Sequence, residues 1–181
     1  MTSETKTKWI VDPKHSEVQF KVKHLAISNV SGTFKIFQGE VESEGDDFNN
    51  ASIHFEMESD SIDTNLQERD GFLKSENFLD VQKFPKLIFD GNLLRKEDNY
   101  HLEGELTIRE TKKSIKMEVE HTGTGMGRFG DYRAGFELNG KISRKDFGLV
   151  FNLATEAGNL IMGEEIKLHC DIEIIRQGEQ L

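Results

Sequence analysis

Polar and apolar residues alternate one by one along this chain in eight separate runs, and this period of two constrains the fold more than any other feature. In one run, Leu102, Leu106 and Ile108 alternate with Glu103, Glu105 and other polar residues. Successive side chains of a β-strand point to opposite faces, so each run predicts a strand with one wet and one dry face. The runs lie at residues 18–22, 34–41, 53–57, 87–93, 100–108, 115–119, 134–142 and 166–174.

The connections between these runs favour a closed antiparallel sheet. Several are short and rich in Gly, Asp and Asn, as at residues 44–47, 96–99 and 123–127. Strands with one dry face are typical of antiparallel sheets, and closure into a barrel leaves no unpaired edge. We therefore predict an all-β fold, an eight-stranded antiparallel barrel, with a two-sheet sandwich as the alternative.

The second run changes phase in its middle. Phe34 and Ile36 share one parity, whereas Phe37 and Val41 share the other. One extra residue transfers every following side chain to the opposite face of a strand. This position therefore predicts a bulge or a bend.

One segment, at about residues 64–82, lacks the alternation. Thr64, with Gln67 three residues later, resembles a capping box at the start of a helix. The segment is also more apolar than an ordinary surface loop. It therefore predicts a short helical insertion that covers one mouth of the barrel, with Phe72, Phe78 and Phe84 closing that mouth.

The length of 181 residues suits one domain, which we expect at residues 9–176, between flexible ends at 1–8 and 177–181. Residues 1–8 contain no apolar run of the kind found in signal peptides, so we expect a cytoplasmic protein unless a leader was removed. No stretch reaches the roughly 20 apolar residues of a spanning helix, and we expect no stable membrane insertion.

Charge and cysteine content exclude some classes of partner. The net charge of −10 opposes binding to phosphate backbones, so we expect no nucleic-acid partner. Cys170 is the only cysteine, so the chain has no internal disulfide and no cysteine cluster for zinc. No two histidines show ligand spacing on one strand, and we predict neither a metal site nor a required cofactor.

The dry faces carry many phenylalanines. A barrel of eight strands is either filled by its side chains or just wide enough for a small ligand. Gly104, Ala134 and Gly140 fall on dry faces and would leave space. We predict an apolar tunnel for a long-chain lipid, lined by Phe20, Phe34, Phe55, Phe89 and Phe136, and keep a solid core as the alternative.

The polar residues of interest cluster where strands should end. Arginine suits a phosphate or carboxylate through two parallel hydrogen bonds, so Arg69 or Arg144 is a candidate for contact with a ligand's head group. The alternative is a structural pair, Arg69 with Asp146 or Arg144 with Asp70. His15 and Ser16 precede the first run without a nucleophile motif, and we predict a backbone role rather than catalysis.

Several of these residues belong to a longer pattern that resembles the YceI-like family. The resemblance covers nearly the whole chain in order. It comprises Trp9-x-x-Asp12-Pro13-x-His15-Ser16, Phe20-x-Val22-x-His24, Gly32-Thr33-Phe34, Ser61-Ile62-x-Thr64, Arg69-Asp70-x-x-Leu73-Lys74-Ser75-x-x-Phe78, Phe84-Pro85-x-Leu87-x-Phe89, Gly104-x-Leu106-Thr107-Ile108-Arg109 and Ile142-x-Arg144-x-Asp146-Phe147-Gly148-Leu149.

This resemblance implies a lipocalin-like barrel that binds polyisoprenoids, such as isoprenoid quinones or polyprenyl diphosphates, and that forms a homodimer. Some relatives hold fatty-acid amides instead. Two positions depart from the family pattern, because Phe72 stands where His is frequent and Glu110 where Gly is favoured. A polar contact from the first position would be lost here.

Together the residues and the resemblance predict a non-catalytic protein that binds, stores or transports a long-chain apolar lipid. Within that class, a fatty-acid or fatty-amide ligand is the alternative to a polyisoprenoid. Two other classes remain open. One is an enzyme that acts on an apolar substrate inside the barrel, and the other is a scaffold with a filled core that binds a protein through its acidic wall.

Overall fold

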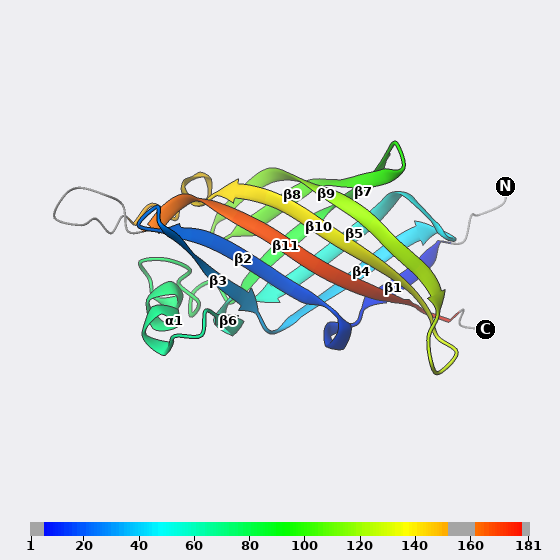
Figure 1. The fold of residues 1–181 in the computed structure, drawn as a ribbon, viewed down its shortest axis with the longest axis horizontal. Coiled ribbons are helices and arrows are strands. Elements are labelled where there is room, and N and C mark those ends of the chain that lie inside the picture. The colour runs from blue at the N-terminus through cyan, green and yellow to red at the C-terminus, as the bar shows by residue number, and fades with distance from the viewer. Residues whose placement is uncertain (1–5, 152–161, 179–181) are drawn as a thin grey trace.

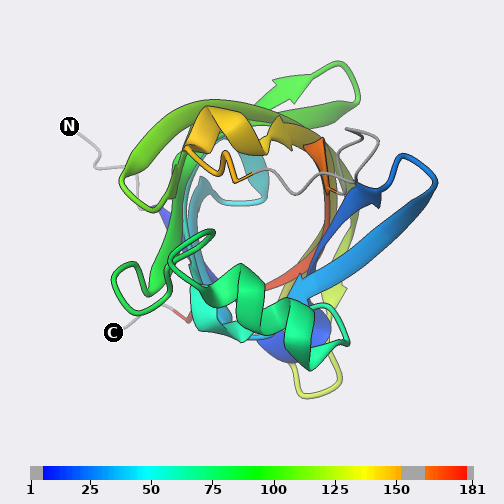
Figure 2. The ribbon, with the colours of Figure 1, turned by 90° about the vertical axis from the view of Figure 1, so that its left-hand side faces the viewer.

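The computed structural model describes residues 6–151 and 162–178. In this described part, eleven strands form one antiparallel sheet that closes on itself (Figures 1 and 2). The strands are β1 (Thr7–Val11), β2 (Glu17–His24), β3 (Ser28–Phe34), β4 (Phe37–Glu44), β5 (Asp47–Glu58), β6 (Ile62–Asp63), β7 (Lys86–Lys96), β8 (Asn99–Ile108), β9 (Thr111–Met126), β10 (Tyr132–Ser143) and β11 (Met162–Arg176).

The eleven strands occupy eight positions around the barrel, because three of these positions are interrupted. The 3₁₀ turn η1 (Pro13–His15) separates β1 from β2, and both strands pair with β11. Likewise β3 pairs with β2 while β4 pairs with β1, and β5 pairs with β4 while β6 pairs with β3. The predicted eight-stranded antiparallel barrel is therefore confirmed, and the sandwich is not formed.

The predicted irregularity in the second run lies between β3 and β4. Lys35 and Ile36 belong to neither strand, and the ladder resumes at Phe37 on the other parity. The backbone remains hydrogen-bonded across this break, since Lys35 donates to the Ser61 carbonyl and Glu58 donates to the Ile36 carbonyl. The change of phase in the sequence thus marks a bend that lets one strand serve two pairings.

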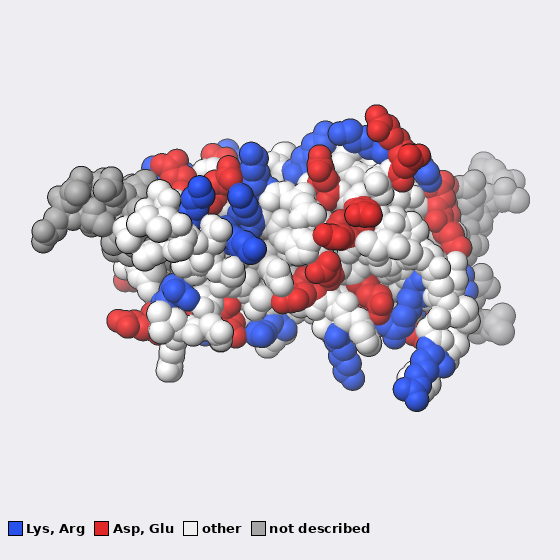
Figure 3. Space-filling model, viewed as in Figure 1, with Lys and Arg blue, Asp and Glu red and all other residues white. Residues whose placement is uncertain are grey.

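The predicted dry faces point into the barrel. On β8, for example, Leu102, Leu106 and Ile108 are buried, whereas Glu103 and Glu105 are exposed. The outer wall carries charges of both signs, and on the face in Figure 3 acidic and basic side chains are mixed. None of the helices in the described part is both long and apolar enough to cross a membrane.

The insertion contains one helix, α1 (Gln67–Lys74), at the end of the barrel to which the β2–β3 hairpin projects (Figures 1 and 2). The predicted capping box is wrong, because the N-cap is Leu66 and no side chain caps the helix. Thr64 lies before this cap, and its hydroxyl instead binds Asp70 Oδ1 at 2.5 Å. The helix is thus held through a residue in its own first turn.

The barrel begins earlier than predicted. Thr7 and Lys8 belong to β1 rather than to a flexible end, and the Lys8 carbonyl accepts a hydrogen bond from the backbone of Gln177 at 2.8 Å. At the other end β11 runs to Arg176, next to the predicted boundary. Residues 1–5 and 179–181 lie outside the described residues.

Candidate ligand-binding cavity

An apolar cavity of about 310 Å³ lies inside the barrel. This volume is near the lower end of the range for small-molecule sites, roughly 300–1,000 Å³. Every second residue of β11 from Ile166 to Ile174 lies on its wall, together with the inward residues of the strands around it. The barrel is therefore not packed solid along its axis.

The structure places all five phenylalanines predicted for the tunnel on the cavity wall. They come from five different strands, namely β2, β3, β5, β7 and β10. Their parity was thus predicted correctly from the alternation, and whether they contact a ligand is a separate question. These residues are Phe20, Phe34, Phe55, Phe89 and Phe136.

The inward glycines do not leave the space that we predicted. A β-carbon added to Gly104 would lie 2.3 Å from the backbone oxygen of Asp90 and 2.7 Å from Phe89 Cζ, and one added to Gly140 would lie 2.7 Å from Met117 Cγ. Ala134 is likewise covered and fully buried. The neighbouring strand's backbone and a ring at Gly104, and a side chain at Gly140, occupy this space, so the small residues do not open the cavity.

The mouth at the α1 end has apolar and polar walls. Phe72 and Phe78 contact the cavity, and the Phe72 ring packs against Phe151 with the ring centres 5.4 Å apart. Phe84 lies outside the cavity wall, and its ring is 5.7 Å from the guanidinium carbon of Arg109. We expected Phe84 to close the mouth, but its ring instead packs against Arg109, at the end of β8.

Polar side chains reach the cavity wall at this mouth. Lys23 and His24 come from the end of β2, while Thr64 and Arg69 come from the insertion. Arg69 donates from Nε to Thr64 Oγ1 at 2.8 Å and from Nη2 to the Thr64 carbonyl at 2.5 Å, and the Thr64 backbone donates to Asp70. Thr64 therefore joins Arg69 and Asp70, although it was predicted only as a cap.

Arg144 and Asp146 are placed differently from these. Arg144 is fully buried, and its guanidinium donates to the carbonyls of Leu149 at 2.7 Å, Gly163 at 2.9 Å and Met162 at 3.3 Å. Burial lowers the pKa of this guanidinium. Asp146 is exposed, and among the described residues neither predicted Arg–Asp pair is formed. Arg144 holds the backbone around the mouth together.

The opposite end of the barrel is filled by aromatic rings. Trp9 and Phe48 are both 0% exposed, and their ring centres are 5.2 Å apart. Phe136 packs edge-on against Phe48 at 5.0 Å, and His121 stacks on Phe136 at 4.9 Å. Trp9 Nε1 donates to Ser43 Oγ at 2.8 Å. Phe48 and Phe136 face the cavity, so this end forms a floor that sequence reasoning missed.

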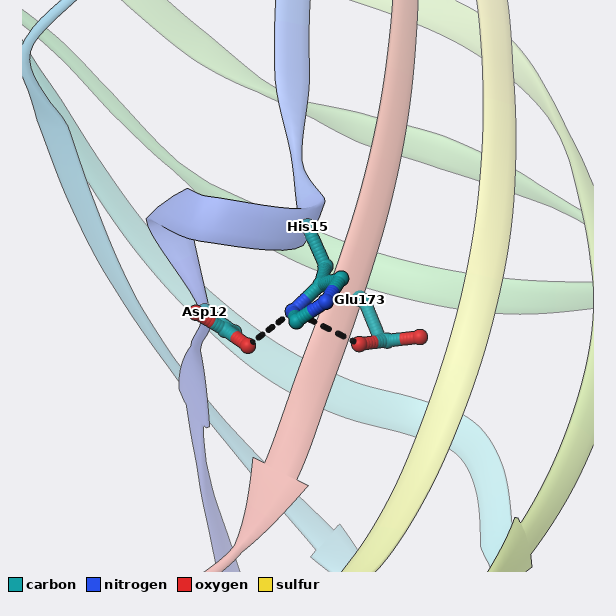
Figure 4. Close-up of side chains that lie close together, drawn as sticks. All are labelled: Asp12, His15 and Glu173. Carbon is teal, nitrogen blue, oxygen red and sulfur yellow. Dashed lines mark hydrogen bonds and ion pairs between the residues drawn. The ribbon is translucent and has the colours of Figure 1, made fainter. Parts of the chain in front are cut away.

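His15, the last residue of η1, lies on the outside of the barrel (Figure 4), and Ser16 is the C-cap of this turn. His15 Nδ1 is 2.7 Å from Asp12 Oδ2 and 3.6 Å from Glu173 Oε2. The Ser16 hydroxyl accepts a hydrogen bond from the backbone N–H of Glu173 at 3.0 Å. Neither side chain is on the cavity wall, and the bonds of both join η1 to β11 or to Asp12.

The same cluster has the residue types of a metal site but is occupied by an arginine. The ligand atoms of Asp12, His15 and Glu173 lie within 4.8 Å of one another, and Arg133 Nη1 binds Asp12 at 2.8 Å and Glu173 at 2.6 Å. Partial burial alone would raise the pKa of Asp12, but hydrogen bonds from Arg133, His15 and the Lys14 backbone lower it to about 2. The guanidinium therefore neutralises carboxylates that a cation would need.

Cys170 faces the cavity, and burial raises the pKa of its thiol to about 12. A thiol with this pKa is almost entirely protonated at neutral pH, so it is a poor nucleophile. His24, the histidine on the cavity wall, pairs with Met162, whereas Cys170 pairs with Val18. On β2, six residues of strand, about 20 Å at 3.4 Å each, therefore separate the two levels.

Comparison with known proteins agrees with this architecture. A family model described as "YceI-like domain" matches residues 9–174. A UPF0312 protein of Yersinia pestis is 36% identical over 163 residues, which cover 88% of this chain and 81% of that protein. The crystal structure of a Campylobacter jejuni YceI protein is 29% identical, with a TM-score of 0.70 and coverage of 99% of this chain and 100% of that one.

A more distant structure has the same fold. It is described as a polyisoprenoid binding domain from Saccharophagus degradans, and its TM-score is 0.68 over 93% of this chain and 98% of that one. At 10% identity, this likeness concerns the architecture of the barrel and not particular side chains.

Proposed function

Because the chain belongs to the YceI-like family, we propose that it binds a long-chain apolar lipid inside its barrel, as a non-catalytic storage or transport protein. A polyisoprenoid, such as a quinone or a polyprenyl diphosphate, is the ligand class that we favour. The structural neighbour described as a polyisoprenoid binding domain supports this choice. A fatty acid or fatty amide would use the same apolar wall and is the second candidate.

The observation that carries the proposal is the length of the apolar wall. From Ile166 to Ile174 the strand β11 lines the cavity without interruption. At ~3.4 Å per residue and a tilt of ~40°, this stretch covers about 20 Å of the barrel axis. Each methylene removed from water contributes about 0.8 kcal/mol, so ten buried carbons contribute about 8 kcal/mol without any polar contact.

The two ends of the cavity suggest how the ligand is oriented. Phe48 and Phe136 form an apolar floor, whereas Lys23, His24 and Arg69 lie on the wall at the α1 mouth. Charged or polar groups are costly to bury without partners, so the apolar tail should occupy the floor end and the head group the mouth. Arg69 is the residue that we propose for contact with an anionic head group.

Catalysis is not part of this proposal. Among the described residues of the wall, the thiol of Cys170 is a weak nucleophile, and it is far from His24 along the strands. A protonated thiol of this kind needs an adjacent base within hydrogen-bond reach to act as a nucleophile. Binding therefore accounts better than chemistry for the side chains that surround the cavity.

The test is the lipid content of freshly purified protein. Native mass spectrometry followed by organic extraction should give one apolar lipid for each chain. Leu168→Glu places a carboxylate on the wall and should lower occupancy by at least about tenfold, because an unpaired buried charge costs several kcal/mol. Lys167→Glu, on the outer face of the same strand, is the matched control and should retain the lipid.

Circular dichroism must show that both variants fold. An empty wild-type protein that also fails to take up farnesol or hexadecanoic acid would overturn the proposed function. Equal lipid content in folded Leu168→Glu and wild-type protein would show that the lipid is bound elsewhere.

A further inference from the structure

Two phenylalanine rings on the cavity wall lie directly over glycines of the neighbouring strand. Phe20 on β2 is paired with Gly32 on β3, and Phe55 on β5 is paired with Gly39 on β4. Because residues paired in this way share one face of the sheet, the missing side chain leaves room for the ring to lie flat against the wall. Both rings line the cavity.

The fit of each ring over its glycine is tight. A β-carbon added to Gly32 would lie 2.3 Å from Phe20 Cζ, and one added to Gly39 would lie 2.6 Å from Phe55 Cδ2 and 2.8 Å from Val11 Cγ2. All the near atoms at these two glycines belong to side chains. At Gly91, in contrast, the added carbon would lie 2.4 Å from a backbone oxygen, so that glycine serves the close approach of two strands.

A methyl group at Gly32 or Gly39 would have to displace the ring above it. Each ring is backed along the wall by another ring, Phe20 by Phe34 and Phe55 by Phe37, with centres 5.7 Å apart in both pairs. The open volume nearest to each ring is the cavity itself. A displaced ring therefore moves inward and narrows the cavity.

We propose that Gly32 and Gly39 are specificity-determining residues, because they hold Phe20 and Phe55 against the wall and so set the width of the cavity at two depths. This inference rests on the proposed function and concerns which ligands the cavity accepts. Gly32 also lies next to Thr64, beside the α1 mouth, whereas Gly39 lies next to Val11, two residues from Trp9 at the closed end. The two glycines thus control a shallow and a deep position.

The two positions predict different changes in selectivity. Every ligand tail that enters from the mouth passes Phe20, so a narrowing there affects chains of all lengths. Only a long tail reaches Phe55, so a narrowing there affects long chains alone. Gly32 would therefore govern the thickness of an accepted chain, and Gly39 its length.

The experiment measures the affinity of decanoic, dodecanoic, tetradecanoic and hexadecanoic acid by calorimetric titration of delipidated protein. Wild-type protein should gain about fourfold in affinity for each added methylene. Gly32→Ala should weaken all four acids by a similar factor, on the order of tenfold. Gly39→Ala should keep decanoic acid within about twofold and weaken hexadecanoic acid by about tenfold or more.

Two further sets of variants separate this effect from a general loss of stability. Gly123→Ala makes the same substitution in strand β9, at a position where nothing lies within 4 Å of an added β-carbon. This variant should bind the acids like wild-type protein. Gly32→Ala/Phe20→Leu and Gly39→Ala/Phe55→Leu remove the displaced ring and should restore the wild-type dependence on chain length.

The outcomes distinguish the two proposals. A wild-type affinity that does not rise with chain length would contradict the proposed function, and the inference would fail with it. A wild-type affinity that rises, with the same curve for Gly39→Ala, would overturn the inference alone. Double variants that stay as weak as the single ones would also overturn it, since the ring would not be the cause.

Discussion

The two ends of this barrel differ in how tightly their side chains are packed. At the closed end, Trp9 and Phe48 are 0% exposed and pack ring against ring. At the α1 mouth, Phe72 is only half-buried, and Leu66 before the helix is 50% exposed. One end is made by strands whose side chains meet across the lumen, and the other by an insertion and turns that lie around an opening. Because of this difference, the two ends of the cavity are not equivalent: one is filled and the other is open.

The largest effect should come from removing a ring of the closed end. Phe48→Ala should destabilise the fold by about 3–5 kcal/mol, because it deletes a fully buried ring and leaves a void. Phe72→Ala at the mouth should cost about 1 kcal/mol, since that ring already meets open space. Urea denaturation of both variants gives the comparison, and equal losses would mean that the ends do not differ in packing.

Arg144 is the exception that should make the mouth sensitive as well. Arg144→Met should cost about 3 kcal/mol, because the buried carbonyl of Leu149 and the partly buried carbonyls of Gly163 and Met162 would lose their donors. Urea denaturation measures this loss. Arg69→Met, which removes a half-buried arginine of the same mouth, serves as the control and should cost about 1 kcal/mol.

Between the two ends, the cluster at η1 should make stability depend on acid. Asp12 has a folded-state pKa of about 2, below its ordinary value of 3.8, so its contribution is complete above about pH 4 and is lost as the pH falls toward 2. The contribution is about 2 kcal/mol. Asp12→Asn should remove this part of the pH dependence in urea titrations between pH 2 and 5.

If the free energy of unfolding of the Asp12→Asn variant fell between pH 5 and 2 as much as that of the wild-type protein, other carboxylates would be the cause. Glu164→Gln is the control. Lys145 lowers the pKa of Glu164 at the mouth, but Glu164 is exposed, so this variant should leave the loss of stability in acid almost unchanged.

The smallest effect should be a gain at the mouth. Leu66 occupies the N-cap of α1 without making a side-chain hydrogen bond there. Leu66→Ser would supply a hydroxyl acceptor for the first turn and should stabilise the fold by about 0.5–1 kcal/mol. Thermal unfolding should show a slightly higher midpoint for Leu66→Ser than for Leu66→Ala, and the opposite order would contradict the capping argument.

The sequence predicted the wall better than either end. Alternation placed Phe20, Phe55 and Phe136 on the correct face, because the period of a strand is a local property of the chain. The change of phase before Phe37 likewise marked a real bend. These features depend only on neighbouring residues, so one sequence was sufficient to find them.

The ends depend on residues that meet only in the folded chain. Trp9 contacts Phe48 because β1 pairs with β4, which pairs in turn with β5, and no local pattern indicates that these two rings meet. The described partners of Arg144 include the backbone carbonyls of Leu149, Gly163 and Met162, which carry no sequence signal. Gly32 and Gly39 were missed for a related reason, since their role depends on which ring lies opposite.

A barrel that is filled at one end has a single opening, through which a ligand would both enter and leave. A ligand bound as proposed would enter past α1 and leave by the same route, because Trp9, Phe48 and Phe136 fill the opposite end of the described barrel. An incoming molecule cannot push out the one already inside, and exchange is then limited by departure. Under the proposed transport role, the ligand would be delivered only where the opening that received it faces the acceptor.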